Sequence, residues 1–452
     1  MTESWILDGT VVTQDSKRRV LPAHLRIVDG RIAAISRSRP RRFARGASVV
    51  SAAGQVVLPG FVQAHVHLCQ TLFRGQADDM ELLDWLSKRI WVMEAAHTEE
   101  TLNVSALLGI HELLSSGTTC VLDMGTVRHT DAIVDAVRSS GIRASVGKCL
   151  MDHPKTTPGD LRESTQGALS EAITLFERWN GSEGDRIRIS YAPRFVVSCT
   201  EKLLSGVADL SREQGALIHT HASENLKELE LVRRMVGCEN IEYLHKLGLT
   251  SPRLVLAHCV WLNRGELGIL ERNGVHVAHC PSSNLKLASG IARVPEMRRR
   301  GINVALGADG APSNNNLSMF QEMRLAALIH KPGLGPRVMR AQEVLDMATR
   351  DGAKALGWFD DIGSIEVGKK ADLIGMDLRG PSNFVMPWGG KTRAAGEAIA
   401  SSIIYSSGAN HLRWTMVDGR MLYRDGRVVT ISEKALMERV RKAQRVIWKR
   451  CR

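Results

Sequence analysis

Five side chains that bind metals or carry protons stand at the ends of short apolar runs. His65 and His67 end the first run, His221 the fifth, His258 the sixth and Asp309 the eighth. Side chains two residues apart in a strand point to the same side, so His65 and His67 can share one metal ion. Imidazole and carboxylate ligands suit Zn²⁺ and also Fe²⁺. Each histidine alone can be an ordinary core or surface residue, but the five together favour one metal centre.

Glu224 lies three residues after His221 and is placed to move a proton. A divalent metal lowers the pKa of its bound water to about 7, and a nearby carboxylate can pass the released proton to a leaving group. The alternative for Glu224 is a negative charge at a helix start, where the helix dipole stabilises it. His219, two residues before His221, can exchange roles with it. These residues predict metal-assisted hydrolysis.

The apolar runs are the strands that must position these groups. Eight of them alternate with segments of helical periodicity, which predicts an α/β fold with a parallel (β/α)8 TIM barrel. The runs cover residues 56–68, 118–124, 142–151, 187–193, 216–223, 254–260, 276–281 and 303–310. Active sites of such barrels lie at the C-terminal ends of the strands. The long gap at 69–117 has room for a loop or helix over that face.

The two ends of the chain resemble each other. Asp-Gly pairs between alternating apolar residues, as in WILDGTVV, predict hairpin turns, and VDGR occurs at 28–31 and again at 417–420. These patterns predict a small β-sandwich domain formed by both termini, with the barrel inserted between them. The expected domains are 1–57 with 365–430 for the sandwich, 58–364 for the metal-dependent barrel and 431–452 for a basic C-terminal helix.

The expected C-terminal helix carries much of the positive charge. The chain has 60 Lys and Arg against 48 Asp and Glu, and residues 433–452 hold eight of the basic residues and two of the acidic ones. Ser432 is a suitable N-cap. The apolar residues near one face of this helix are Leu436, Val440, Ala443 and Ile447. We expect that face to pack on the body and the basic residues to lie in solvent.

A net charge of +12 raises the alternative of a basic nucleic-acid-binding protein with an inactive barrel. Aromatic residues are only 5% of the chain and do not interleave with the basic clusters, so we expect no nucleic-acid partner. No apolar run reaches the roughly 18 residues of a membrane span. The eight scattered cysteines form no CxxC pair, and the N-terminus shows no secretory signal. These features favour an enzyme of the cytoplasm.

Two other zinc-enzyme motifs are absent from the chain. The segment HELLS begins at His111 but has Ser115 where a zinc peptidase has its second histidine. The HxE and PCxxC pattern of cytidine deaminases is missing as well. Metal-assisted hydrolysis by this chain would therefore use the barrel metal.

The motifs around the strand ends resemble the amidohydrolase superfamily, in its metal-dependent aminohydrolase branch of nucleoside, purine and triazine deaminases. These motifs are PGFVQAHVHL, HTHASEN, LAHCV, AHCPSSNLKLASG, LGADGAPSNNN and IGSIEVGKKADLIGMD. The resemblance implies one divalent metal, with zinc preferred over iron. The implied metal ligands are His65, His67, His221 and Asp309.

The same resemblance implies the remaining catalytic roles. Glu224 and His258 act as proton shuttles, and Asp309 also activates the hydroxide. The HxxE spacing of the branch favours His221 over His219 as the ligand. A homo-oligomer, dimeric or tetrameric, is the expected assembly.

Substrate contacts are also implied by the resemblance. Residues 72–97 resemble the segment that closes over the substrate in adenosine-type deaminases, and Glu94 matches a carboxylate that accepts hydrogen bonds from ribose. Trp85 and Trp91 either line an aromatic wall or pack this segment on the barrel. The other implied substrate-binding residues are Gln70, Arg194, Phe195 and His279.

The resemblance thus implies hydrolytic deamination of an adenine nucleoside at C6, which releases ammonia and an inosine-type product. The candidate substrates are 5′-deoxyadenosine, adenosine, S-adenosylhomocysteine and methylthioadenosine. The thioether-nucleoside deaminases of the branch usually have His-Ala-Pro-Tyr where this chain has Arg-Phe-Val-Val, which favours 5′-deoxyadenosine. The alternative is a guanine or triazine aminohydrolase or chlorohydrolase, because Gln70 and Arg194 match residues that contact guanine.

Overall fold

The computed structural model describes residues 2–383 and 392–451. The chain divides into two compact units. The first consists of residues 1–62, 111–120 and 318–432, and the second of residues 63–110, 121–317 and 433–452. All of the predicted metal-binding, proton-transfer and substrate-binding residues belong to the second unit. The predicted domain boundaries stay a prediction.

One sheet in the first unit is built from both ends of the chain, with the strand order β18-β17-β16-β15-β5-β1-β2-β3 and β4 paired to β1. Its strands are β1 (Glu3–Val12), β2 (Val20–Val28), β3 (Arg31–Ser36), β4 (Ser48–Ser51), β5 (Val56–Pro59), β15 (Leu373–Met376), β16 (Leu412–Val417), β17 (Arg420–Arg424) and β18 (Arg427–Val428). Strand β15 pairs with β5, which joins the two ends of the chain. The predicted sheet from both termini is confirmed.

The two VDGR motifs form the predicted hairpin turns. Asp29-Gly30 joins β2 to β3 and Asp418-Gly419 joins β16 to β17, and all four residues have positive φ. Two consecutive positive φ angles define a type I′ turn, whose twist matches the flanking strands.

The turn predicted in WILDGTVV is wrong, because β1 continues through Asp8 and Gly9. Asp8 has a φ of 62°, and the pairing of β1 with β2 shifts register between Ile6 and Gly9. The residues before this bulge pair with β4, and those after it pair with β5. A Cβ at Gly9 would lie 2.9 Å from Val57, so the close approach of β5 requires glycine. The local Asp-Gly signal therefore marks an exchange of strand partners here.

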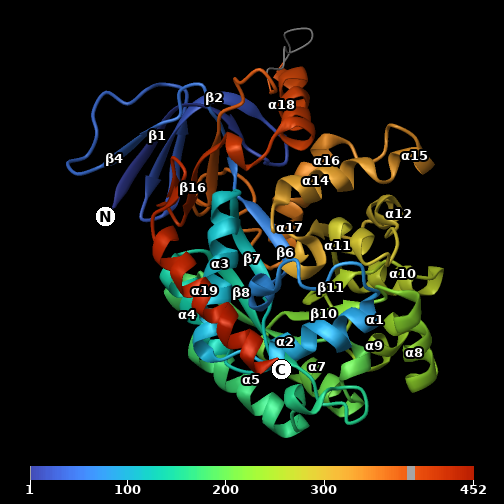
Figure 1. The fold of residues 1–452 in the computed structure, drawn as a ribbon. Coiled ribbons are helices and arrows are strands. Elements are labelled where there is room, and N and C mark those ends of the chain that lie inside the picture. Colours follow the sequence, from blue (N-terminus) through green and yellow to red (C-terminus); the bar gives the residue numbers. More distant parts are fainter. Residues whose placement is uncertain (1, 384–391, 452) are drawn as a thin grey trace. The chain divides into compact units, whose positions relative to one another are not determined.

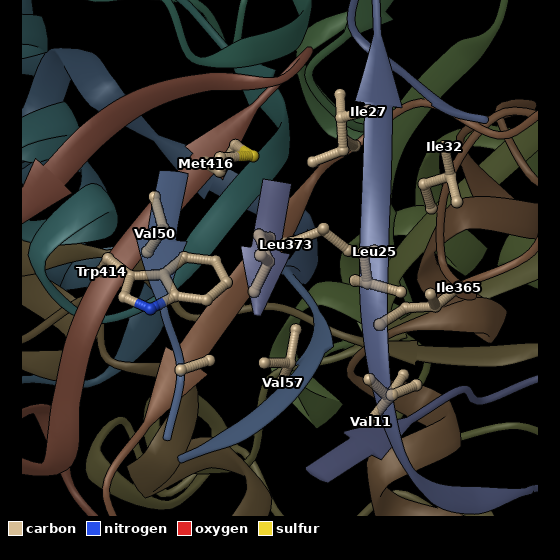
Figure 2. Close-up of a cluster of buried hydrophobic side chains, with 14 residues drawn as sticks. Val11, Leu25, Ile27, Ile32, Val50, Val57, Ile365, Leu373, Trp414 and Met416 are labelled. Carbon is tan, nitrogen blue, oxygen red and sulfur yellow. The ribbon is translucent and has the colours of Figure 1, made fainter. Parts of the chain in front are cut away.

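The core of this sheet is a cluster of apolar side chains from β1 to β5, β15 and β16. Trp414, Met416 and Val50 lie to one side of Leu373 and Val57 in this cluster (Figure 2). These five side chains are between 0 and 7% exposed. Because the cluster draws on both ends of the chain, neither end alone can bury it.

The second sheet is parallel and has the order β13-β12-β11-β10-β9-β8-β7-β6-β14. Its strands are β6 (Phe61–His67), β7 (Thr118–Met124), β8 (Arg143–Leu150), β9 (Ile187–Pro193), β10 (Ile218–Ala222), β11 (Leu254–His258), β12 (His276–His279), β13 (Val304–Leu306) and β14 (Asp309–Gly310). The last predicted run contains β13 and β14, and β14 pairs in parallel with β6. This pairing brings the last run back to the first, which confirms the predicted TIM-barrel fold.

Helices alternate with these strands and lie around their outside, as α4, α5, α7 and α8 show in Figure 1. The main ones are α3 (Glu99–Ser115), α4 (Thr130–Ser140), α5 (Thr165–Trp179), α7 (Glu201–Gln214), α8 (Leu226–Val236), α9 (Asn240–Lys246), α10 (Arg264–Asn273) and α12 (Val294–Arg299). Gly215 and Gly274 end α7 and α10 in the left-handed conformation, and a strand follows each of them.

Short helices follow several strand ends. After β6 come η1 (Leu68–Phe73) and a helical stretch made of α1 (Leu82–Trp85), η2 (Leu86–Ile90) and α2 (Trp91–Ala95). After β12 comes α11 (Pro281–Lys286), and after β14 comes α13 (Ala311–Asn314). The stretch at 82–95 occupies the gap where the sequence predicts a loop or helix.

The C-terminal helix α19 (Glu433–Arg450) packs as the sequence predicts. Leu436, Val440, Ala443 and Ile447 are buried, whereas most of its Lys and Arg side chains are exposed. Arg439 is half-buried and donates to Asn103 in the second unit. Among the described residues, none of the helices combines the length and apolar character needed to cross a membrane.

Candidate active site

The predicted metal-binding residues converge at the C-terminal ends of β6, β10, β11 and β14. The Nε2 atom of His67 lies 3.2 Å from Nε2 of His221, and Oδ1 of Asp309 lies 3.2 Å from Nε2 of His65 and 3.4 Å from Nε2 of His67. Ligand atoms of His65, His221, His258 and Asp309 all lie within 4.8 Å of one another. The described residues thus bring five nitrogen and oxygen donors to one point.

The hydrogen bonds of His67 and His221 show that this donor set fits a cation. Nδ1 of His67 lies 2.8 Å from the carbonyl oxygen of Met124, and Nδ1 of His221 lies 2.7 Å from that of Arg194. A carbonyl oxygen only accepts, so both Nδ1 atoms carry the proton and both Nε2 atoms present a lone pair. Burial holds the pKa of both imidazoles well below the usual value, so they are neutral. Two lone pairs at 3.2 Å repel each other unless a cation lies between them.

His65 completes this arrangement, and His219 lies behind it. Nδ1 of His65 is 2.8 Å from Nε2 of His219, while Nε2 of His65 faces Asp309. Both histidines are fully buried. The structure therefore places His221 in the cluster and His219 on its far side, where it orients His65 as the outer partners of metal-binding histidines do.

Asp309 is held by two hydroxyl groups. Its Oδ2 accepts from Oγ of Ser283 at 2.6 Å and from Oγ of Ser313 at 2.9 Å, which leaves Oδ1 facing the histidines. Burial alone would raise the pKa of Asp309, but the adjacent imidazoles of His65, His258 and His67 hold it well below the usual value. Asp309 and His258 have φ angles of 62° and 74°. Such strain in residues other than glycine clusters at functional sites.

Glu224 and His258 face each other beside the cluster. Oε2 of Glu224 lies 3.5 Å from Nε2 of His258, and Oε1 accepts from Oγ of Ser289 at 3.3 Å. Burial raises the pKa of Glu224 to about 7. Burial lowers the pKa of His258, but the carboxylates of Glu224 and Asp309 outweigh it and raise the pKa above the usual value. Glu224 can therefore exchange a proton near neutral pH, with the imidazole of His258 facing it.

The helix-start alternative for Glu224 does not describe its surroundings. Helix α8 begins at Leu226, and its capping box is formed by Asn225 and Glu228. The carboxylate of Glu228 accepts from the backbone N–H of Glu224 at 2.7 Å. Glu228 caps the helix, and the carboxylate of Glu224 lines the pocket.

A pocket opens over this cluster, between the strand ends and the helical stretch at 82–95. Its lining is formed by His67, Gln70, Leu82, Trp85, Leu86, Arg194, Phe195, His221, Glu224, Glu228, His258, Leu287 and Asp309. The side chains of Leu82, Trp85 and Leu86 supply an apolar wall. The pocket lining therefore combines an apolar wall with the polar side chains of the cluster.

The predicted substrate-binding residues divide into two groups. Gln70, Arg194 and Phe195 line the pocket. Among the described residues, Trp91, Glu94 and His279 are not part of this lining. Of the two tryptophans, Trp85 lines the pocket, whereas Trp91 packs near Phe195 with ring centroids 6.5 Å apart.

Glu94 is bound to two residues that do line the pocket. Its carboxylate accepts from both terminal nitrogens of Arg194, at 2.6 and 3.1 Å, and from Nε2 of Gln70 at 2.9 Å. The Glu94 and Arg194 side chains are only 2 and 3% exposed. The charge of Arg194 is thus compensated within the protein.

Several residues of the site were not predicted. Ser283 lies in α11 and Ser313 in α13, the short helices after strands β12 and β14, and a search for hydroxyl groups within a few residues of strand ends would have found them. Leu82, Leu86 and Leu287 carry no chemical signal, because an apolar residue in a loop is as compatible with packing as with binding.

The chain is similar to known proteins over most of its length. A family model described as "Amidohydrolase family" matches residues 56–422. The chain is 38% identical to a 5-methylthioadenosine/S-adenosylhomocysteine deaminase of Syntrophobacter fumaroxidans over 98% of both chains. It is 38% identical to a 5′-deoxyadenosine deaminase of Methanosarcina mazei over 88% of this chain and 87% of that protein. An adenosine deaminase from Xanthomonas campestris, solved with bound zinc, is 30% identical, superposes with a TM-score of 0.88 and covers 99% of both chains.

Proposed function

The chain belongs to the amidohydrolase family, and we propose that it hydrolyses the C6 amino group of an adenine nucleoside, releasing ammonia. It is similar over most of its length to hydrolases that act on C–N bonds. The observation that carries the proposal is the convergence of His65, His67, His221 and Asp309 beside the Glu224–His258 pair. This combination unites a metal-ligand set with a proton-transfer pair.

A single divalent metal, zinc in preference to iron, would be held by His65, His67, His221 and Asp309. Such a metal polarises a bound water and lowers its pKa to about 7. The facing lone pairs of His67 and His221 support this assignment. We assign His258 to proton transfer and not to the ligand set, because its Nε2 faces the carboxylate of Glu224 at 3.5 Å.

Glu224 carries one of the two proton transfers of the reaction, and His258 and Asp309 carry the other. Glu224, whose pKa is raised to about 7, takes a proton from the attacking water and gives it to the ring nitrogen beside C6. His258 and Asp309 orient the water and pass its second proton to the leaving amine. The buried position of both carboxylates strengthens these interactions, because little solvent screens them.

The pocket lining supports an adenine nucleoside with an uncharged 5′ group, such as 5′-deoxyadenosine. Arg194 is the one arginine or lysine that the described part of the chain contributes to the lining, and it is paired with Glu94, so a substrate carboxylate would find no free cation among these residues. Leu82 and Leu86 add apolar surface. We also keep in the proposal the recognition of ribose by Glu94, an aromatic wall that includes Trp91, and a substrate contact by His279. Guanine is the second candidate substrate, because Gln70 and Arg194 both line the pocket.

Ammonia release from 5′-deoxyadenosine, adenosine, S-adenosylhomocysteine and guanine tests the proposal. We expect 5′-deoxyadenosine and adenosine to be turned over with higher kcat/KM than the other two. Guanine turned over faster than every adenine nucleoside would replace the substrate assignment, and no ammonia from any of the four would refute the deaminase. A cytoplasmic location, a homodimer or homotetramer and the lack of a nucleic-acid partner stay predictions.

A further inference from the structure

One short segment contacts three of the proposed proton-handling groups. It consists of α11 and the turn after it, residues 281–290, and we call it the α11 segment. Ser283 donates to Oδ2 of Asp309 at 2.6 Å, Oδ1 of Asn284 lies 2.9 Å from Nδ1 of His258, and Ser289 donates to Oε1 of Glu224 at 3.3 Å. The three side chains are between 0 and 2% exposed. Asp309, His258 and Glu224 come from three different places in the chain, and this segment touches each of them.

The backbone of the α11 segment is held tightly. The amide of Ser289 donates to the carbonyl oxygen of Asn284 at 2.8 Å, and that of Leu287 donates to Ser283 at 3.0 Å. Trp261 Nε1 donates to the carbonyl oxygen of Ser289 at 2.7 Å. Ala288 has a φ of 50°, a left-handed conformation that non-glycine residues keep only where the surroundings impose it. The three polar side chains are therefore fixed relative to one another.

The contact with Asn284 decides which nitrogen of His258 carries a proton. A side-chain amide oxygen only accepts, so Nδ1 of His258 is the donor. Nε2 of His258 is then the nitrogen that faces Glu224, 3.5 Å away. Without Asn284 the neutral ring of His258 could carry its proton on Nε2 instead of Nδ1. The nitrogen that faces Glu224 would then no longer be held as a proton acceptor.

We infer that the α11 segment is a single positioning element for the proton transfers, with Asn284 setting the tautomer of His258 and Ser289 setting the orientation of Glu224. Only the expected effect on kcat rests on the proposed deaminase function. The tautomer of His258 is a property of the folded protein whether or not a nucleoside is the substrate.

The kinetic test uses Asn284→Leu, Ser289→Ala and the double variant, in zinc-loaded protein with 5′-deoxyadenosine. Removal of an outer partner of a catalytic group typically costs 10–100-fold in activity, so we expect kcat to fall by that factor in each single variant while KM and zinc content stay near wild type. The effects of residues that act as one unit are not additive. The kcat of the double variant should therefore lie within about threefold of the kcat of the worse single variant. Ser289→Thr keeps the hydroxyl and should recover most of the activity.

The matched control is Leu285→Ala on the same helix, whose side chain is 42% exposed and outside the pocket lining. It should leave kcat within about twofold, as expected for an exposed residue without a partner at the site. Multiplicative losses in the double variant, or single variants with wild-type kcat, would overturn the inference even though wild-type protein deaminates the nucleoside.

A second readout does not depend on activity. In ¹⁵N-histidine NMR spectra of the zinc-loaded protein, recorded at a pH where the His258 ring is neutral, the His258 signal, identified from its loss in His258→Gln, should show only Nδ1 protonated in wild type. The Nε2-protonated tautomer should appear in Asn284→Leu. The same tautomer in both proteins would refute the role of Asn284, whereas failure of all four substrates with the expected spectra would refute only the proposed function.

Discussion

The buried pair between Glu94 and Arg194 supports a sharp prediction. Glu94→Gln keeps the shape of the side chain but removes its charge. The carboxylate of Glu94 accepts two hydrogen bonds from Arg194, and the two side chains are 2 and 3% exposed. A guanidinium buried to this extent cannot regain its hydration when its partner is neutralised. Glu94→Gln should therefore destabilise the second unit strongly.

The burial of the pair sets the expected magnitude. Removing one partner of a buried ion pair costs about 3–5 kcal/mol, because an uncompensated charge is left in the interior. Arg194→Met should cost a similar amount, since it leaves Glu94 without its cation. The double variant Glu94→Gln/Arg194→Met removes both charges and should be more stable than either single variant. The exposed pair Arg212–Asp209, 2.8 Å apart with both side chains 62% exposed, is the matched control. Asp209→Asn should cost no more than about 1 kcal/mol.

Urea denaturation of the four variants and wild type, under identical zinc and buffer conditions, measures these free energies of unfolding. A cost below about 1 kcal/mol for Glu94→Gln, equal to that of the exposed pair, would show that the charge is compensated in another way. Additive costs in the double variant would show that the two charges do not stabilise each other. Either result would refute the reasoning. Arg194 could then no longer be regarded as unavailable to a substrate carboxylate.

Four further predictions follow from the same structure. Glu224→Gln should lower kcat by roughly 10²–10⁴-fold with zinc still bound, measured by ammonia release and elemental analysis; near wild-type turnover would contradict the proton shuttle. Elemental analysis should find about one metal per chain, and His219→Ala should weaken metal affinity 10–100-fold, in a chelator titration, because His65 loses its partner. Burial raises the pKa of Asp123 to about 7, so the folded protein favours the protonated carboxyl group. The stability that this preference contributes is fully present below the pKa of Asp123 in the unfolded chain, and it is lost as the pH rises through 7. In urea titrations, the free energy of unfolding of Asp123→Asn should therefore rise by roughly 3 kcal/mol relative to that of wild type between pH 5 and pH 8. A difference between the two proteins that does not change with pH would count against a buried acid. Deletion of 433–452 should lower the melting temperature but leave metal content unchanged, since α19 packs through four apolar residues; an unchanged melting temperature would contradict that packing.

Much of the barrel and of the metal site was predictable because local patterns determine both. Apolar runs alternating with helical segments define strands buried on both faces, and the C-terminal ends of parallel strands meet at one face of the barrel. A histidine that ends a run, such as His221 or His258, must then lie near that face. The same logic holds for the turns at Asp29 and Asp418, where two positive φ angles suit Asp-Gly. It fails at Asp8, because the exchange of neighbours from β4 to β5 depends on strands far along the chain.

The sequence alone determined the barrel, the sheet from both termini and the group of histidines with Asp309. Its signals were the period of the strands, the chemistry of the turns and the residue types at the strand ends. Only the tertiary structure decided the partners of these residues. It placed His219 behind His65, engaged Glu94 with Arg194 and Gln70, and brought Ser289 to Glu224. Periodicity is a property of neighbouring residues, whereas each of these contacts joins side chains 24 to 154 positions apart. Such contacts depend on how the loops fold over the face of the barrel, and no local pattern encodes that path.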